Sequence, residues 1–230
     1  MKERGRGALS GLFHWVPWLG RAAAITNLMA VMTLVYFMVR SEYGPIGVRM
    51  RSILANEAVF HWSWGVKILS AVMMTGVFLV LVWMLEAQYR SILQMALMIW
   101  IIGAAGWILQ DLMQMWVMPT LSRMFLAVPT AGLADYILMW ERLLFRLGGV
   151  FSCTCYAISG LIYTAIMFRS DHIPSGMARY SFVVWCFVLL TAVSVRWLEG
   201  MMPWLTAFAL LMLVPWFWRL GQWLPRPAPS

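Results

Sequence analysis

Six long runs of apolar residues constrain the fold of this chain more than any other feature of its sequence. The runs are 16 to 28 residues long, close to or above the roughly 20 residues that an α-helix needs to cross a hydrocarbon core about 30 Å thick. The predicted spans lie near residues 22–39, 62–85, 91–118, 147–168, 180–195 and 202–218. No remaining stretch is long enough to form a soluble domain. We therefore expect an all-α integral membrane bundle of six transmembrane helices with short interfacial helices.

The composition supports a membrane protein and argues against a nucleic-acid-binding one. Hydrophobic residues make up 63% of the chain and charged residues only 11%, far from the balance of a soluble domain. The formal net charge is +8, but the basic residues lie mostly at the ends of the apolar runs. In that position they act as topology signals and lipid-headgroup contacts. We expect the lipid bilayer as a partner, possible association with other membrane subunits, and no nucleic acid.

The distribution of Lys and Arg also predicts the orientation of the chain. Six spans place both termini on the same side of the membrane, and that side holds slightly more Lys and Arg than the other. Lys2, Arg4, Arg6 and Arg21 cluster before the first span, and such a cluster usually dominates orientation. We expect a multi-pass protein of the bacterial inner membrane with both termini in the cytoplasm.

The segments outside the spans have distinct predicted roles. Residues 1–21 contain Trp15 and Trp18 and are expected to lie at the membrane surface. Residues 220–230 are rich in proline and predict an extended cytoplasmic tail. The two long connections, Ser41–Phe60 and Pro119–Arg146, are expected to form surface helices or caps on the outer face.

Two opposite charges are predicted to meet inside the membrane. Asp111 precedes the outer end of the third span by about seven residues, and Lys67 follows the outer start of the second span by about five. Since these helices run in opposite directions, the two side chains come to a similar depth. An ionised group in hydrocarbon costs roughly 2.5–3.5 kcal/mol. We therefore expect Lys67 and Asp111 to pair in the outer half of the bundle.

Two interpretations of this pair remain open. Gln110, Asp111 and Gln114 follow helical spacings of three and four, so they share one face of the third span. The face, together with Lys67, predicts either a water-filled pocket that opens outward or an interhelical salt bridge with supporting hydrogen bonds. In both cases, removing one charged partner alone should be worse than removing both.

A second candidate site lies just before the fourth span. Arg142 and Arg146 are one helical turn apart on the same face, and Tyr136 lies upstream. Two guanidinium groups at an interface suit a phosphate or lipid headgroup. They equally suit simple anchoring of the helix end.

No motif in the sequence predicts a catalytic centre or a firm cofactor site. Cys153, Cys155 and Cys186 lie inside predicted spans and are expected to be small apolar thiols rather than disulfides or metal ligands. We predict neither a metal nor a cofactor. Two alternatives stay open: a haem with a single ligand at His61 and a Cu(I) ion held by thioethers. The thioethers would be those of Met113, Met115, Met118 and Met124.

The fourth span carries a stripe of small residues that predicts close helix packing. Its members are Gly149, Ser152, Cys153, Ala157, Gly160 and Thr164. Small side chains in such a stripe let another backbone approach closely. We expect this helix to be the packing centre of the bundle.

The run Ala55–Leu85, ANEAVFHWSWGVKILSAVMMTGVFLVLVWML, resembles uncharacterised six-span bacterial inner-membrane proteins of unknown function. The shared pattern is a short outer helix followed by an aromatic–glycine–aliphatic entry into a long apolar span. Lys67 departs from the aromatic or aliphatic residue expected after the glycine. The resemblance implies a six-helix architecture and no known activity.

These features favour a non-enzymatic accessory or scaffold subunit of a membrane complex, because the sequence is rich in packing and interface features and poor in reactive groups. A small-solute transporter or channel that uses Lys67 and Asp111 is the first alternative. A membrane enzyme that holds a lipid at Arg142 and Arg146 is the second. An accessory subunit should co-purify with a fixed set of other subunits. A transporter should lose transport when Lys67 or Asp111 is neutralised, and an enzyme should depend on a lipid substrate.

Overall fold

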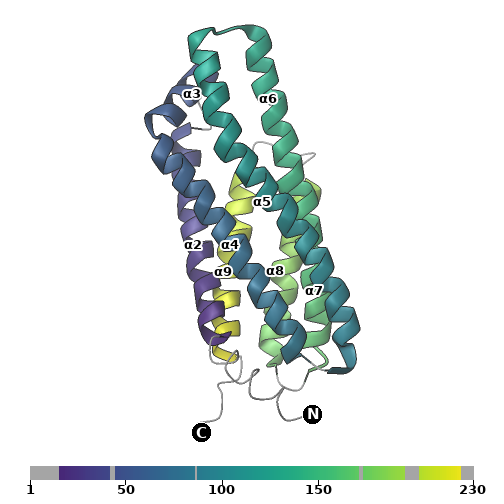
Figure 1. The fold of residues 1–230 in the computed structure, drawn as a ribbon. Helices are drawn as coiled ribbons and strands as arrows, with labels where there is room; N and C mark the ends of the chain where they lie inside the picture. Colours follow the sequence, from purple (N-terminus) through teal and green to yellow (C-terminus); the bar gives the residue numbers. More distant parts are fainter. Residues whose placement is uncertain (1–15, 42–44, 86, 171–172, 195–201, 224–230) are drawn as a thin grey trace, which may run out of the picture.

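A computed structural model describes residues 16–41, 45–85, 87–170, 173–194 and 202–223, which are helices joined by short turns, with no strand among them. The segments are α2 (Val16–Ser41), α3 (Ile46–Ala55), α4 (Glu57–Met84), the 3₁₀ turn η1 (Ala87–Tyr89), α5 (Arg90–Ala127), α6 (Ala131–Phe145), the π-helix η2 (Arg146–Ser152), α7 (Cys153–Met167), α8 (Ser175–Ser194) and α9 (Met202–Trp223). Six helical stretches are long and apolar enough to cross a membrane. The prediction of an all-α bundle with six membrane-spanning helices is confirmed (Figure 1).

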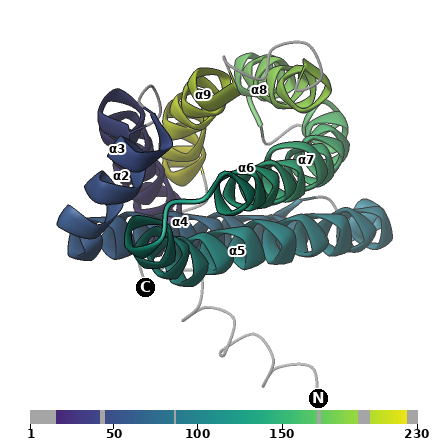
Figure 2. The same ribbon diagram turned by 90° about the horizontal axis from the view of Figure 1, so that it is seen from above.

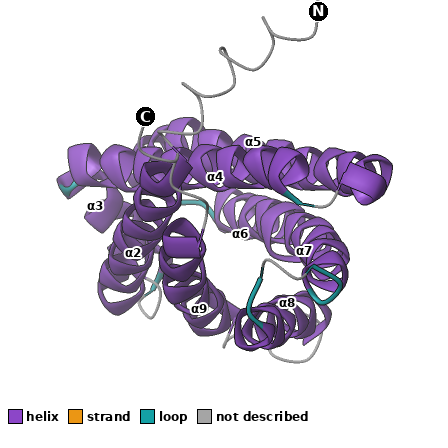
Figure 3. Ribbon diagram, turned by 90° about the horizontal axis from the view of Figure 1, so that it is seen from below, coloured by secondary structure: helices purple, strands orange, loops and turns teal. Residues whose placement is uncertain are grey.

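The spanning helices form a closed ring. Going round it, α2 packs on α4, α4 on α5, α5 on α7, α7 on α8, α8 on α9, and α9 again on α2. Figure 2 views this arrangement from above and Figure 3 from below. The ring closes where two glycines meet, since a Cβ at Gly20 would lie 2.8 Å from the Cα of Gly221.

Aromatic side chains fill the centre of the ring. Phe78 of α4 stacks on Trp100 of α5 with ring centroids 3.7 Å apart. It also contacts Tyr163 of α7, Trp185 of α8 and Trp216 of α9 at 4.9, 5.7 and 5.8 Å. All five side chains are essentially inaccessible to solvent. We call this group the aromatic core; it joins five of the six helices at one level.

The outside of the ring is suited to lipid. Large apolar side chains such as Met32, Met95 and Leu190 are more than 60% exposed. At the end of the bundle where α2 begins and α9 ends, arginines lie over aromatic rings. Arg21 lies 5.3 Å from the centre of Trp18, and Arg90 lies 5.0 Å from that of Trp83. Such pairs are typical of a membrane–water interface, and we call this the proximal end.

The third span is much longer than its apolar run suggests. It was expected to end near residue 118, but α5 continues through Pro119 to Ala127 over 38 residues, or about 57 Å at 1.5 Å per residue. Pro119 removes one backbone donor but does not end the helix. Leu121 and Phe125 beyond it are buried, so tertiary packing holds the extra turns. The second long connection is therefore a helical hairpin rather than a cap.

The hairpin belongs to a compact unit at the opposite, distal end of the bundle. We define the distal head as α3, the first turns of α4, α5 from Met118 onward, and α6. Its helices share a small hydrophobic core of their own. The core consists of Met50, Ile53, Phe60, Met118, Leu121, Phe125 and Ile137. The expected helical part of the Ser41–Phe60 connection is present as α3.

The two predicted terminal segments lie only partly within the described residues. The predicted interfacial segment 1–21 overlaps α2, which already begins at Val16, and its residues 1–15 lie outside the described part. Of the predicted extended tail 220–230, residues 220–223 are instead the last turn of α9, and residues 224–230 lie outside the described part. The stripe of small residues on the fourth span is buried throughout, as expected.

Candidate functional site

Lys67 of α4 and Asp111 of α5 form a buried ion pair. The Nζ atom of Lys67 donates a hydrogen bond to Oδ1 of Asp111 at 2.9 Å. The side chain of Lys67 is 9% exposed and that of Asp111 is fully buried. Helices α4 and α5 are neighbours that run in opposite directions, so the two charges reach one level. The predicted pairing is confirmed.

Two indole rings surround the lysine ammonium. Nζ of Lys67 lies 3.8 Å from the ring centre of Trp64 and 5.6 Å from that of Trp107. Trp64 is one turn from Lys67 on α4, and Trp107 is one turn from Asp111 on α5. The face of an indole attracts a cation through its quadrupole. The ammonium is therefore held by one carboxylate and two aromatic faces.

Several buried polar atoms next to this pair have no partner within the described residues. They are Oδ2 of Asp111, the hydroxyl of Tyr156 and Oγ of Ser70. Tyr156 lies on α7 with its ring 6.0 Å from that of Trp107, and Ser70 follows Lys67 by one turn on α4. Buried polar groups are nearly always hydrogen-bonded. These three atoms leave hydrogen-bonding capacity beside the ion pair that Lys67 does not use.

The two predicted glutamines have different surroundings. Gln110 is buried, and its side chain lies against the backbone of Gly148 so closely that a Cβ at that position would overlap it. Its Oε1 has no hydrogen-bond partner in the described part of the chain. Gln114 is only partly buried. Gly148 belongs to the π-helix η2, a geometry often found at functional sites, and sequence reasoning did not single it out.

The pair lies near the distal limit of the apolar layer. Asp111 follows Arg90 by 21 positions along α5, which corresponds to about 31 Å. A further 16 positions separate it from Ala127, so about 24 Å of helix extends beyond it. A bilayer core is about 30 Å thick. Measured from Arg90, Met118, where the distal head takes over on α5, is about 42 Å away, roughly 10 Å beyond the thickness of a bilayer core.

The predicted headgroup residues Tyr136, Arg142 and Arg146 all lie on the exposed surface. They lie on the continuous helix formed by α6 and η2, on the same side as Met139 and Leu143. None of the three predicted residues makes a side-chain hydrogen bond or ion pair within the described ranges. The helix thus presents a face that combines apolar and basic side chains.

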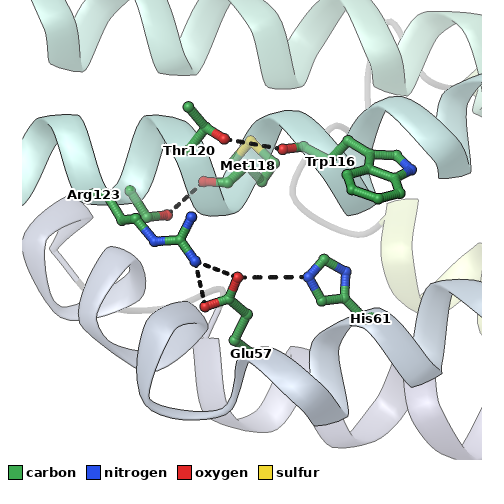
Figure 4. A network of polar contacts seen from close by, with 7 residues as sticks. Glu57, His61, Trp116, Met118, Thr120 and Arg123 are labelled. Carbon is green, nitrogen blue, oxygen red and sulfur yellow. Dashed lines mark hydrogen bonds and ion pairs between the residues drawn. The ribbon is translucent and has the colours of Figure 1, made fainter.

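A second polar cluster, which the sequence did not predict, ties α4 to α5 in the distal head (Figure 4). Nη2 of Arg123 lies 2.5 and 2.7 Å from the two carboxylate oxygens of Glu57. Nε2 of His61 lies 3.6 Å from the same carboxylate, and its ring faces Trp116 at 6.2 Å. A third pair, Arg49 with Glu141, joins α3 to α6. Glu57 and His61 are four residues apart on α4, but Arg123 and Glu57 are 66 residues apart and Arg49 and Glu141 are 92 apart, so no local pattern signals these two ion pairs.

The alternatives for metal or haem gain no support from the geometry. Met118 is buried, whereas Met113 and Met124 are exposed, so these thioethers do not share one face of α5. His61 is engaged with Glu57, and His14 and His172 lie outside the described residues. Among the residues described, no group of three or more His, Cys, Asp or Glu is placed to hold a metal ion. The three cysteines are free thiols.

No protein-family model, curated protein or solved structure matches this chain. The resemblance of Ala55–Leu85 to six-span inner-membrane proteins therefore stays a prediction.

Proposed function

We propose that this polytopic membrane protein is a non-enzymatic accessory subunit of a larger membrane complex in the bacterial inner membrane. The observation that carries the proposal is the exposed face of α6 in the distal head. Met139 and Leu143 are 61% and 58% exposed there, beside the exposed Tyr136. The continuous helix α6–η2–α7 runs over 37 residues, Ala131–Met167, or about 55 Å at 1.5 Å per residue. This exceeds the roughly 30 Å of a bilayer core, so we place the part of this face farthest from Met167, around Tyr136 and Met139, beyond the lipid.

Apolar side chains in that position favour a protein partner. Patches of this kind on a water-facing surface typically mark interaction sites. Arg142 and Arg146 flank the apolar residues on the same side of the helix, and Arg is common in protein interfaces. We infer that the occupant is a helix of a partner subunit, with an apolar stripe and acidic residues opposite the two arginines.

The distal head is suited to a rigid docking role. Its own hydrophobic core and the pairs Arg49–Glu141 and Glu57–Arg123 connect α3, α4, α5 and α6. A surface fixed in this way loses little conformational entropy when a partner binds. Lys67 and Asp111 then serve mainly to hold α4 against α5.

Native mass spectrometry of the protein extracted gently from its own membrane tests the proposal. We expect a hetero-assembly of fixed stoichiometry with the wild type and its loss with Met139→Glu. Val48→Glu is the matched control, because Val48 is an exposed apolar residue of the distal head on α3, away from the α6 face. A monomer, a homo-oligomer or bound phospholipid alone in the wild type would contradict the proposal.

A small-solute transporter or channel is the second candidate. The unpartnered oxygen of Asp111 and the unpartnered hydroxyl of Tyr156 beside Lys67 favour it, since a solute could satisfy both groups. The aromatic core argues against a static open path, because it fills the ring on the proximal side of the pair. Loss of uptake in Asp111→Asn, with the assembly intact, would favour this candidate over the first.

A further inference from the structure

We propose that Trp64, Trp107 and Asp111 form a binding site for a small primary alkylammonium ion, and that the ammonium group of Lys67 occupies this site in the present structure. The lysine side chain is then a tethered occupant that an external ligand displaces. This inference is independent of the accessory role of the distal head. It names a substrate class for the transport alternative, and binding can be measured without transport.

The surroundings of the lysine ammonium match those that recognise a free ammonium ion. Its nitrogen lies 3.8 Å from the ring centre of Trp64, 5.6 Å from that of Trp107 and 2.9 Å from Oδ1 of Asp111. Aromatic faces combined with a carboxylate are the usual recognition set for organic ammonium groups. The set is supplied by α4 and α5 and needs no part of the lysine main chain.

The site has more hydrogen-bonding capacity than Lys67 uses. Asp111 is fully buried with the side chain of Trp107 as a hydrogen-bonding neighbour besides Lys67, and its Oδ2 accepts no hydrogen bond of good geometry within the described chain. Tyr156 is 5% exposed, and its hydroxyl likewise lacks a partner there. A bridge whose only role is structural gains from satisfying both carboxylate oxygens, because the burial of charge is costly. A ligand with three N–H donors that is free of the lysine backbone can approach both oxygens at once.

The same contacts limit the ligand class. A quaternary ammonium ion could lie against the indoles but could not donate a hydrogen bond to Asp111, so a primary ammonium is favoured. Beyond the polar atoms of Ser70 and Tyr156, the buried face of α4 continues with the apolar side chains of Ala71 and Met74. These surroundings suit a short alkyl group. Two cations cannot share the site, so Lys67 must leave when the ligand binds.

Size-matched substitutions of Lys67 test the proposal. Lys67→Ala removes three methylene groups and the ammonium, which is the volume of propylammonium. Lys67→Met removes one heavy atom, the ammonium nitrogen, which leaves space for an ammonium ion and none for propylammonium. We expect the Ala variant to bind propylammonium at least ten times more tightly than the ammonium ion, and the Met variant to show the reverse order. Isothermal titration calorimetry in lipid nanodiscs, at constant ionic strength, measures both affinities.

Three controls complete the experiment. Asp111→Asn in the Lys67→Ala background should abolish saturable binding, Trp64→Leu should weaken it, and tetramethylammonium should not compete. The wild type should bind propylammonium more weakly than Lys67→Ala, because its own ammonium competes. Lys67→Met serves as the test should Lys67→Ala fail to fold. Binding without size preference, binding that survives Asp111→Asn, or no binding to the wild type at any concentration would overturn the proposal.

Discussion

At the scale of single residues, two kinds of position are sensitive to substitution. At some glycines an added Cβ would collide with a neighbouring side chain, and at the buried ion pair the loss of one residue leaves the other charge without its partner. Gly148 is one such position, because the side chain of Gln110 occupies the space that a Cβ would fill. Gly160 is another, where a Cβ would collide with the indole of Trp185. Neither constraint follows from the conformational freedom of glycine, since no described residue of the chain has a positive φ.

We predict that Gly148→Ala lowers the free energy of unfolding by about 1–3 kcal/mol, because overpacking forces Gln110 out of place. Gly65→Ala is the control: its Cβ would meet nothing within 4 Å, and Ala favours a helix by roughly 0.5–1 kcal/mol. Thermal unfolding in detergent compares the two variants. The added substitution Gln110→Ala should restore part of the loss, and equal stability of the two glycine variants would contradict the packing argument.

The Lys67–Asp111 pair leads to a prediction about additivity. Asp111→Leu alone leaves a buried lysine without its partner and should cost about 3–5 kcal/mol of unfolding free energy. The double variant Lys67→Met/Asp111→Leu should lose much less than the sum of the single losses. Chemical denaturation of the four proteins gives the coupling free energy. A coupling close to zero would mean that the pair contributes nothing to stability.

At the scale of elements, packing in the distal head stabilises two helices whose lengths do not match a bilayer, the short α3 and the long α5. α3 has only 10 residues and would not persist alone in water. It is held by Met50 and Ile53 in the head core and by the ion pair between Arg49 and Glu141. Helix α5 continues past Pro119 for the same reason, because its last turns pack on that core.

We expect Glu141→Gln to loosen α3 without affecting the membrane ring. The pair is about one fifth exposed, so its loss should cost about 1 kcal/mol or less. Hydrogen exchange should rise in residues 46–55 and stay unchanged in α8. Asp135→Asn, an exposed acid on the same helix, is the control and should leave both regions as they are. Unchanged exchange in residues 46–55 would show that the head core alone holds α3.

At the scale of the whole molecule, the ring closes around the aromatic core. Trp100 lies within 6 Å of Phe78, Tyr156 and Trp185, which belong to three other helices. Its indole N–H also donates to Oγ1 of Thr75 at 3.0 Å. One side chain therefore connects neighbours that lie far apart in the sequence.

Replacing Trp100 with Ala should destabilise the entire bundle by about 3–5 kcal/mol, because a large cavity would open between four helices. Trp62→Ala is the matched control, since Trp62 is 64% exposed on the outside of α4. Unfolding followed by circular dichroism in detergent should show one cooperative transition, shifted strongly for Trp100→Ala and little for Trp62→Ala. Similar shifts for both would contradict a central role for the aromatic core.

The orientation of the whole molecule is also testable. The charge distribution predicts that the proximal end is cytoplasmic and that the distal head faces outward. With the native cysteines replaced, Thr130→Cys at the hairpin turn should react with a membrane-impermeant maleimide in intact cells. Gly176→Cys at the start of α8 should react only after permeabilisation; both positions are exposed. The opposite labelling pattern would reverse the predicted topology.

Some of this architecture could be predicted from particular residues. The six spans follow from apolar runs whose length matches a bilayer, which is a local property of the chain. The pairing of Lys67 with Asp111 followed from the distance of each residue from the outer end of its span. It also needed the assumption that consecutive antiparallel helices are neighbours. The exposed basic pair Arg142 and Arg146 followed from a spacing of four. Each of these inferences needs only the helical repeat and the high cost of charge in hydrocarbon.

What the sequence by itself determined is the helical class, the number of long apolar helices and the matching levels of Lys67 and Asp111, because lipid requires every spanning backbone to satisfy its own hydrogen bonds. The tertiary structure alone decided the rest. Contacts between distant segments closed the ring, placed five aromatic residues in its centre and carried α5 past Pro119. They also set two indoles around the lysine ammonium and left Oδ2 of Asp111 without a partner in the described chain. Such features depend on packing between helices, which no local pattern encodes.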